Sequence, residues 1–188
     1  MTSLPGRPAP RVARVTRVDE LTPDLIDEAT SSLARLVADG AALGWVTPPD
    51  RVDVTALLRS VVEAGTQDAC LVIAGDNTRF AGLGYWLRYA RPTHRPHADI
   101  EKLAVSPDFQ RRGVGRALLA ALIGHARVES VEMLTLDFRG DNAGAESLYR
   151  SMGFAEYGRL RDFVAPDEHQ RFDMVMHAID LRKPTLVE

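Results

Sequence analysis

The sequence predicts an α/β fold of the α+β kind, in which a mixed, mostly antiparallel central sheet of about six to seven strands carries helices on both faces. Three observations support this prediction. Strand patterns occur both before and after a central strand–helix–strand unit. That unit contains a glycine- and arginine-rich loop, DFQRRGVGR, at residues 108–116. No repeat, low-complexity block or linker divides the 188 residues, a length that suits one domain.

The composition indicates a globular protein and argues against several other classes. Hydrophobic residues make up 45% of the chain and charged residues 26%, and a net charge of −3 gives no reason to expect nucleic acid or an acidic membrane as a partner. The single cysteine, Cys70, rules out an internal disulfide bond. No apolar stretch approaches the roughly 20 residues that span a bilayer. We therefore expect a cytoplasmic protein with a disordered tail at residues 1–10 and a single domain at residues 11–188.

The N-terminal part of the domain predicts one strand and two helices. Residues 11–18 alternate polar and apolar side chains with the two-residue period of a half-buried strand. Thr22 followed by Pro23 is typical of a helix start, and apolar residues then recur at helical spacing until Gly40. After an irregular stretch that ends in two prolines, residues 52–65 predict a second, shorter helix.

The rest of the chain predicts a meander, a strand–helix–strand unit and two final strands. Residues 70–75 and 79–90 flank the turn signal GDNT and form a predicted hairpin, to which residues 98–105 add a third strand. The remaining expected elements are a helix that follows the glycine loop, a strand at 131–138, a helix at 142–154, and strands at 155–164 and 171–181.

The loop at residues 108–116 has the chemistry of a phosphate-binding site. A helix N-terminus presents unpaired backbone N–H groups and a partial positive charge. Gly113 and Gly115 lack a Cβ, so a ligand can approach the backbone closely. Arginine side chains pair well with phosphate oxygens, and the loop contains Arg111, Arg112 and Arg116. The alternative interpretation is a solvated basic turn.

Two other phosphate-binding motifs fit this loop less well. A P-loop needs a Gly-Lys pair, which the chain does not contain. A dinucleotide-binding fold is matched by G-x-G in GVGRAL and by Asp137 at the end of the next strand, but Leu118 stands at the third glycine position. Seven residues also separate Val105 from Gly113, where a dinucleotide-binding strand turns almost at once.

The stretch LAVSPDFQRRGVGRALL resembles the signature of the GNAT superfamily of acyl-CoA-dependent N-acetyltransferases, a strand ending in V-x-P followed by Q/R-x-x-G-x-G/A. A second block of that family, N…A…LY…GF, is matched in register, and the resemblance covers roughly residues 70–181. The matching positions are Gln110, Arg111, Arg112, Gly113, Val114 and Gly115 in the first block, and Asn142, Ala145, Leu148, Tyr149, Gly153 and Phe154 in the second.

This resemblance implies acetyl-CoA as the cosubstrate, no metal, and a protein that is a monomer or a homodimer. The loop amides from Arg111 to Arg116 would hold the diphosphate, and the pantetheine arm would pair with the strand at 98–105. The sheet would part between that strand and the strand at 131–138 to admit the acyl group. The cofactor-binding residues implied are Leu103, Ala104, Val105, Gln110, Arg111, Arg112, Gly113, Val114, Gly115, Arg116, Asn142, Ala145 and Tyr149.

The expected chemistry requires a base, an acid and a hydrogen-bond donor. An alkyl amine with a pKa of about 10.4 is almost fully protonated at neutral pH, so another group must remove its proton before the amine attacks a thioester. The departing thiolate can take a proton from a nearby hydroxyl, a role that we assign to Tyr149, with plain packing as the alternative. The backbone N–H of Val105 is the expected donor to the carbonyl oxygen.

Three carboxylates are candidates for the base. Strand alternation places Asp99, Glu101 and Leu103 on one face, and Ile100 and Lys102 on the other. A further acid, at position 137, ends the neighbouring strand, and two carboxylates at one site would raise the pKa of one of them. The alternative is that these are ordinary solvated acids.

A closer resemblance, to the tabtoxin-resistance type of acetyltransferase, rests on residues 99–105 and on LTLD. That type is thought to use acids at the positions of Asp99 and Asp137, whereas Glu101 falls where it need not have one.

The sequence leaves the acceptor open. We expect direct transfer of an acetyl group, in a ternary complex, to a primary amine of a small molecule; a non-catalytic acyl-CoA-binding module and a protein or peptide N-acetyltransferase are the alternatives. Trp45 and Trp86 are weak candidates for walls of the acceptor pocket, with core packing as an equal explanation. His94 and His97 form H-x-x-H, but a loop bounded by prolines is more often simply exposed, so no metal site is expected.

Overall fold

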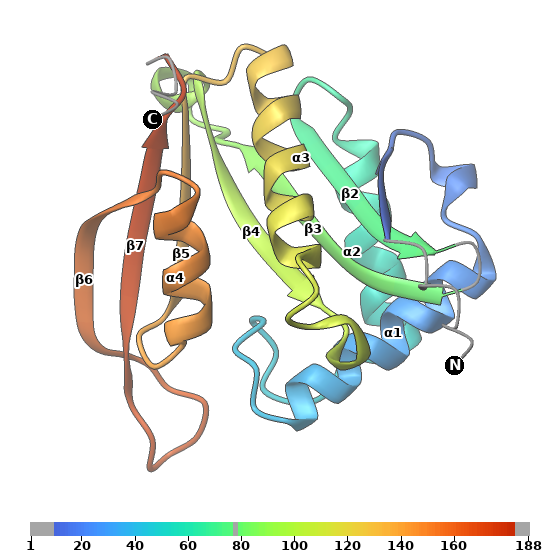
Figure 1. The fold of residues 1–188 in the computed structure, drawn as a ribbon, viewed down its shortest axis with the longest axis horizontal. Helices are drawn as coiled ribbons and strands as arrows, with labels where there is room; N and C mark the ends of the chain where they lie inside the picture. The colour runs from blue at the N-terminus through green and yellow to red at the C-terminus, as the bar shows by residue number, and fades with distance from the viewer. Residues whose placement is uncertain (1–9, 77–78, 183–188) are drawn as a thin grey trace, which may run out of the picture.

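The computed structural model describes residues 10–76 and 79–182, and its centre is a seven-stranded sheet in the order β1-β2-β3-β4-β5-β7-β6 (Figure 1). The strands are β1 (Arg11–Val15), β2 (Ala69–Asp76), β3 (Arg79–Arg88), β4 (His97–Val105), β5 (Met133–Arg139), β6 (Ala155–Val164) and β7 (Phe172–Asp180). The helices are α1 (Pro23–Ala38), α2 (Arg51–Glu63), α3 (Val114–Val128) and α4 (Ala143–Ser151), with short 3-10 helices η1 (Val18–Glu20), η2 (Pro92–His94) and η3 (Pro107–Phe109).

The sheet is mixed and mostly antiparallel. Every neighbouring pair of strands is antiparallel except β4 and β5, which run parallel and are connected through α3. A parallel pair needs such a crossover, whereas antiparallel neighbours need only a turn. The predicted fold class is therefore confirmed.

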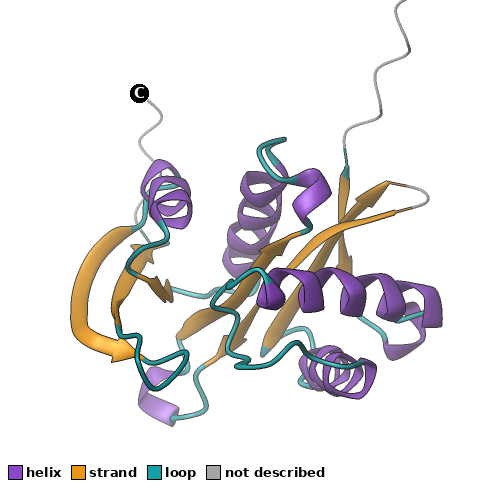
Figure 2. Ribbon diagram, turned by 90° about the horizontal axis from the view of Figure 1, so that it is seen from below, coloured by secondary structure: helices purple, strands orange, loops and turns teal. Residues whose placement is uncertain are grey.

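Helices cover both faces of this sheet, as predicted (Figure 2). On one face α1 and α2 bury Leu33 and Leu58 against β2 and β3. On the other face α3 buries Leu118 and Leu122, and the same hydrophobic cluster continues to Tyr149 of α4. The sheet thus separates two hydrophobic cores, each of which removes the apolar face of its helices from water.

The ends of the first two helices follow from their capping residues. Thr22 Oγ1 accepts a hydrogen bond from the Leu25 amide at 3.3 Å, which confirms the predicted start of α1, and Gly40 after its end has a φ of 87°. The second helix begins one residue before the predicted stretch because Asp50 and Asp53 form a capping box.

Two glycines of β3 allow α3 to lie close to the sheet. A Cβ on Gly82 would meet the carbonyl oxygen of Ala104 at 2.5 Å and Leu118 at 3.2 Å. A Cβ on Gly84 would meet side chains of Leu103 and Leu122 at 2.9 and 3.1 Å. The absence of side chains at these positions therefore sets the spacing of α3, β3 and β4.

A β-bulge interrupts the pairing of β3 with β4. Tyr85 pairs with Lys102, but the next residue, Trp86, pairs with Ile100. Glu101 is the extra residue on β4, where two residues face one on the partner strand.

The bulge makes one prediction wrong. Regular alternation placed Asp99 and Leu103 on the same face, with Ile100 on the other. Instead Leu103 packs against the cluster beneath α3, which contains Ile100. Asp99 and Lys102 lie on the opposite face, where the ammonium group of Lys102 lies over the ring of Tyr85. An inserted residue reverses the face of every side chain beyond it, and the side-chain pattern alone does not reveal the insertion.

The parallel pair of β4 and β5 is short. Pairing extends only from His97 with Met133 to Ile100 with Leu136. Beyond these residues β4 continues to Val105 and β5 to Arg139 without pairing to each other. The two strands diverge there, as expected from the family resemblance.

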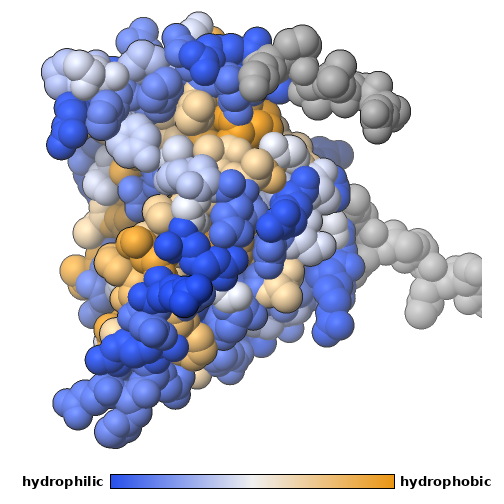
Figure 3. Space-filling view, turned by 90° about the vertical axis from the view of Figure 1, so that its left-hand side faces the viewer, coloured by the Kyte–Doolittle hydropathy of each residue, from blue (hydrophilic) through white to orange (hydrophobic). Residues whose placement is uncertain are grey.

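The outer side of the sheet is formed by β6, and its surface is largely hydrophilic with hydrophobic side chains among the polar ones (Figure 3). Tyr157, Leu160 and Phe163 of β6 are all exposed. Pairing of β6 with β7 is interrupted by two register shifts, and Asp162 has a φ of 53°. Such irregularities make an edge strand a poor template for another strand.

Two expectations fall partly or wholly outside the described residues. The turn of the confirmed β2–β3 hairpin includes residues 77–78, and the expected disordered tail covers residues 1–9 in addition to residue 10. Within residues 10–76 and 79–182, no helix combines the length and apolar character that crossing a membrane requires.

Replacement of Gly82 by alanine tests the close approach of β3 and β4. We expect Gly82→Ala to lower the free energy of unfolding by about 1–3 kcal/mol, because its Cβ would overlap the backbone of β4. Gly124→Ala in α3 is the matched control, since nothing lies within 4 Å of its added Cβ, and a helix interior favours alanine. Chemical denaturation of both variants measures the difference. Equal stability of the two would contradict this account of the packing.

Candidate active site

The glycine–arginine loop turns sharply into α3. Arg111 has a φ of 56° and Gly113, the N-cap of α3, has a φ of 80°, both in the left-handed region. The side-chain amide of Gln110 donates to the Val105 carbonyl at 3.3 Å, which connects the loop to the end of β4. The amides of the first turn of α3 are thereby presented at the mouth of the diverging strands.

The loop arginines have different environments. The guanidinium of Arg112 lies 5.5 Å from the ring centroid of Phe109, a buried residue that anchors the loop. Arg116 donates to Ser151 Oγ at 2.7 Å, so it joins α3 to the end of α4. Arg111 and Arg116 both line the cavity that the loop borders, whereas Arg112 is not among its lining residues.

A cavity of about 510 Å³ lies between this loop, β4 and α4. It is lined by every residue that the family resemblance assigned to the cofactor except Arg112. Those residues are Leu103, Ala104, Val105, Gln110, Arg111, Gly113, Val114, Gly115, Arg116, Asn142, Ala145 and Tyr149.

Six further lining residues were not predicted. They are Leu36, Ala41, Ala42, Leu43, Gly144 and Leu148. The first four belong to the end of α1 and the stretch after it, and in the sequence these small and apolar residues resemble ordinary core positions. These residues reach the cavity because of the direction in which α1 crosses the sheet, and no local sequence pattern predicts that direction.

Tyr149 is a buried residue at the inner end of this cavity. Its ring packs against Phe138 at 5.5 Å and Phe154 at 5.9 Å between centroids. Burial, and then the negative charge of Asp137, raise the pKa of Tyr149 to about 12. The hydroxyl is therefore protonated at neutral pH and has a proton to donate.

Asp99 is the centre of a small hydrogen-bond network. Its carboxylate accepts from the Thr135 hydroxyl and from Tyr89 Oη at 3.4 Å. Tyr89 Oη and Thr135 Oγ1 are also 2.7 Å apart. These hydrogen bonds fix the position of the Asp99 carboxylate on the face that it shares with Thr135. Neither Tyr89 nor Thr135 was predicted, because residues 46 positions apart show no pattern in the sequence.

Glu101 and Asp137 are the other two candidate acids. Both side chains reach solvent on one side, yet the protein around their carboxyl groups removes enough water to raise their pKa values. The charge of Asp99 raises both pKa values further, while the neighbouring Lys102 lowers that of Glu101. Two carboxyl groups with raised pKa values thus lie near a third that is held by hydrogen bonds.

The acids and Tyr149 lie on opposite sides of the sheet. Leu136 and Phe138 of β5 point into the cluster that contains Tyr149. By the two-residue period of a strand, Asp137 points to the other face, which Asp99 also shares. A group placed in the gap between β4 and β5 would therefore have carboxylates on one side and the tyrosine hydroxyl on the other.

The two tryptophans differ in position. Trp86 is fully buried beneath α3 as part of the hydrophobic core, and its indole N–H donates to the Leu122 carbonyl at 3.2 Å. Trp45 is partly exposed in the segment between α1 and α2, and its ring lies 4.6 Å from Lys102 Nζ. Trp45 thus borders the acid-bearing face of the sheet.

In the described parts of the chain, no three His, Cys, Asp or Glu side chains are grouped closely enough to hold a metal ion. His94 instead packs edge-on against Tyr89 at 6.0 Å.

The open sheet, the loop and the cavity define the architecture of an N-acetyltransferase domain. The chain belongs to the acetyltransferase (GNAT) family, whose family model matches residues 17–154. The resemblance inferred from the two sequence blocks is therefore confirmed at the level of the family.

Curated relatives match parts of the chain. It is 39% identical over 84 residues to the [ribosomal protein bS18]-alanine N-acetyltransferase of Escherichia coli K12, which is 45% of this chain and 56% of that protein. It is 28% identical over 153 residues to the mycothiol acetyltransferase of Saccharomonospora viridis, which is 78% of this chain and 48% of that protein. The chain thus spans about half the length of these relatives.

Solved structures support the fold. An acetyltransferase from Salmonella typhimurium, determined with its cofactor acetyl-CoA, superposes with a TM-score of 0.79 at 17% identity over 96% of this chain and 99% of that one. A phosphinothricin acetyltransferase from Sinorhizobium meliloti in complex with acetyl-CoA gives a TM-score of 0.78 at 17% identity over 96% and 92% of the two chains. At these identities the similarity establishes a shared fold.

The raised pKa of Asp137 predicts a pH-dependent cost to stability. Because the folded protein holds the Asp137 proton more tightly than the unfolded chain, the ionised carboxylate destabilises the fold above that pKa, and the penalty vanishes well below about pH 4. Asp137→Asn should therefore raise the melting temperature at neutral pH and give no such gain in acid. Thermal unfolding at both pH values measures this, with the exposed Asp162→Asn as control. A gain of equal size in acid would contradict the assignment.

Proposed function

We propose that this protein is an acyl-CoA-dependent N-acetyltransferase that transfers an acetyl group from acetyl-CoA to a primary amine by direct attack in a ternary complex. The observation that carries this proposal is the gap between β4 and β5, with acids on one side and Tyr149 on the other. A non-catalytic acyl-CoA-binding module would need only the loop and the cavity, so the acids and the tyrosine favour an enzyme.

The residues around the cavity fit coenzyme A. Gly115 in the first turn of α3 leaves space that a side chain would fill, because an added Cβ would lie 3.3 Å from Leu148 and 3.6 Å from Val105. Helix N-terminal amides and Arg111 suit a diphosphate. Asn142 caps α4 by accepting from the Ala145 amide at 3.0 Å, which leaves its amide NH₂ group to face the cavity. When bound, acetyl-CoA supplies a thioester whose acetyl group an amine can attack.

Asp137 is the general base in this proposal. Asp99 is held in place by Thr135 and Tyr89, and its charge raises the pKa of Asp137 and attracts a cationic amine. The positive charge of the neighbouring Lys102 lowers the pKa of Glu101, which makes Glu101 the weaker candidate for the base. A carboxyl group with a raised pKa accepts a proton more readily, directly or through a water molecule.

Tyr149 is the general acid. Its raised pKa keeps the hydroxyl protonated at neutral pH, so it holds a proton that can pass to the thiolate sulfur as the carbon–sulfur bond of the thioester breaks. The tyrosine reaches the gap from the cavity side, whereas the amine would arrive from the side of Asp99 and Asp137. Deprotonation of the nucleophile and protonation of the leaving group are thereby assigned to separate faces of the sheet.

The acceptor in this proposal is a primary amine of a small molecule, bound between the acids and the segment that contains Trp45. A peptide N-terminus is the second candidate, supported by the match to an enzyme named for acetylating an alanine of a ribosomal protein. The match to a mycothiol acetyltransferase supports the first candidate, a small molecule. Both acceptors carry the positive charge that the acidic face attracts.

A panel of amines tests the proposal. Thiol release from acetyl-CoA is followed with aminoglycosides, amino acids, polyamines and short peptides as acceptors. We expect at least one acceptor whose turnover rises with pH through the pKa of Asp137, and Asp137→Asn should abolish that rising limb by removing the base. Coenzyme A binding without turnover by any acceptor would favour the binding module. Failure to bind coenzyme A would contradict the proposal outright.

Replacement of Tyr149 by phenylalanine tests the general acid separately. Tyr149→Phe keeps the packing against Phe138 and Phe154 but removes the proton, so we expect kcat to fall by about 10²–10⁴-fold. The affinity for coenzyme A, measured by calorimetry, should be nearly unchanged and serves as the internal control. An unchanged kcat would remove Tyr149 from the mechanism and leave it a packing residue.

A further inference from the structure

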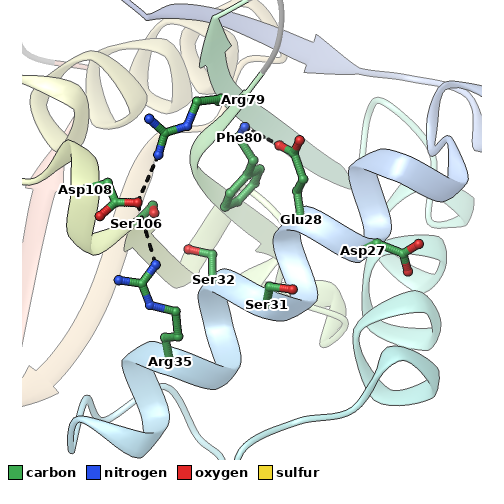
Figure 4. A pocket seen from close by; sticks show the side chains of 9 residues that line it. All are labelled: Asp27, Glu28, Ser31, Ser32, Arg35, Arg79, Phe80, Ser106 and Asp108. Carbon is green, nitrogen blue, oxygen red and sulfur yellow. Dashed lines mark hydrogen bonds and ion pairs between the residues drawn. The ribbon is translucent and has the colours of Figure 1, made fainter.

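A second cavity, of about 360 Å³, lies on the other face of the sheet from α3 (Figure 4). Its floor is the middle of α1, its upper wall is the start of β3, and its far wall is formed by Ser106, just after β4, and by Asp108 at the start of the glycine–arginine loop. The cavity contains none of the residues that line the acetyl-CoA cavity. Its lining residues are Asp27, Glu28, Ser31, Ser32, Arg35, Arg79, Phe80, Ser106 and Asp108.

Two guanidinium groups converge at one end of this cavity. Arg79 Nη2 lies 2.9 Å and Arg35 Nη1 lies 3.6 Å from the same atom, Asp108 Oδ2. Each guanidinium has five N–H donors, so one shared carboxylate oxygen satisfies only a small part of their capacity. The three side chains are partly exposed, and ion pairs of this kind are weak. A second carboxylate can therefore join or replace Asp108 at little cost.

Ser32 supplies an independent sign of a missing partner. Its side chain is only 6% exposed, and within residues 10–76 and 79–182 its Oγ finds no hydrogen-bond partner. In contrast, the hydroxyl of Thr30 donates to the Ile26 carbonyl and that of Ser60 to the Leu57 carbonyl. Figure 4 shows the Ser32 hydroxyl pointing from α1 into the cavity instead. A buried hydroxyl without a partner is costly, and a ligand would remove that cost.

The other end of the cavity is acidic. Glu28 accepts the Phe80 amide with one carboxylate oxygen, Oε2, which fixes the side chain above α1. Asp27 is already paired with Arg51 of α2. Because Arg51 neutralises Asp27, the charges that remain in the cavity are those of two arginines and of Glu28 and Asp108, which sum to zero. The arginines lie at one end of the cavity and Glu28 at the other.

We propose that this cavity binds a small zwitterion of the free amino acid class. The carboxylate of the ligand lies between Arg35 and Arg79 and accepts the Ser32 hydroxyl, and its ammonium group lies against Glu28. A dianion such as phosphate would face Glu28 and Asp108, and a simple cation would face both arginines, so neither complements the whole cavity. The site adjoins the glycine loop, since Arg79 and Arg112 lie over the same ring, that of Phe109.

An NMR titration of the full chain without acetyl-CoA tests this site. The probes are the protein amino acids, each compared with its N-acetyl form, which lacks the ammonium group, and its methyl ester, which lacks the carboxylate. We expect at least one amino acid to shift the amide signals of Ser31, Ser32, Phe80 and Asp108 in a saturable way, and both derivatives to bind at least about tenfold more weakly. No response to any amino acid, or equal binding of a derivative, would overturn the proposal.

Variants distinguish this cavity from the acceptor site. Ser32→Ala removes the unpartnered hydroxyl, so it should melt at the same or a higher temperature than the parent without ligand and bind the amino acid about tenfold more weakly. Arg35→Gln should weaken binding at least as much. Ser60→Ala, whose hydroxyl bonds within α2, is the control and should bind as the parent does. Unchanged binding in both Ser32→Ala and Arg35→Gln would place the ligand elsewhere and refute the site.

Discussion

The short pairing of β4 with β5 is the constraint on which the rest of the site depends. The two parallel strands share hydrogen bonds over only four residue pairs and then diverge. Without that divergence the sheet would be closed between Val105 and Asp137, and the cavity beside α3 would be separated from the acids on the opposite face. The bulge at Glu101 lies where the divergence begins, so the change of register and the opening of the sheet occur together.

The surrounding structure keeps this gap in place by close packing on the α3 side. Gly82 and Gly84 let α3 lie against β3, and the indole N–H of Trp86 donates a hydrogen bond to a carbonyl of α3. The loop that begins α3 is anchored by Phe109 and by the bond from Gln110 to β4. These contacts fix the start of the loop, and its last residues continue into α3, so its amides are directed at the cavity.

The cluster of three acids carries a cost to stability. The pKa values of Glu101 and Asp137 are raised because each ionised carboxylate has lost water and faces the charge of Asp99. A protein under selection for stability alone would relieve such a cluster. His177 is a further example of an unrelieved buried group: it is fully buried against Phe138, and neither ring nitrogen finds a partner among the described residues. Burial lowers its pKa, which keeps the ring neutral.

The secondary-structure elements and the glycine–arginine loop could be predicted from the sequence alone. Helix caps such as Thr22, the alternation of strands and the spacing of Gly113 and Gly115 are local features, and each is decided by residues within a few positions of one another. The tertiary structure alone decided the bulge at Glu101, the burial of Trp86 and the meeting of Tyr89, Thr135 and Asp99. These depend on strand register and on the order of strands in the sheet, which are set by contacts between distant segments and leave no periodic trace along the chain.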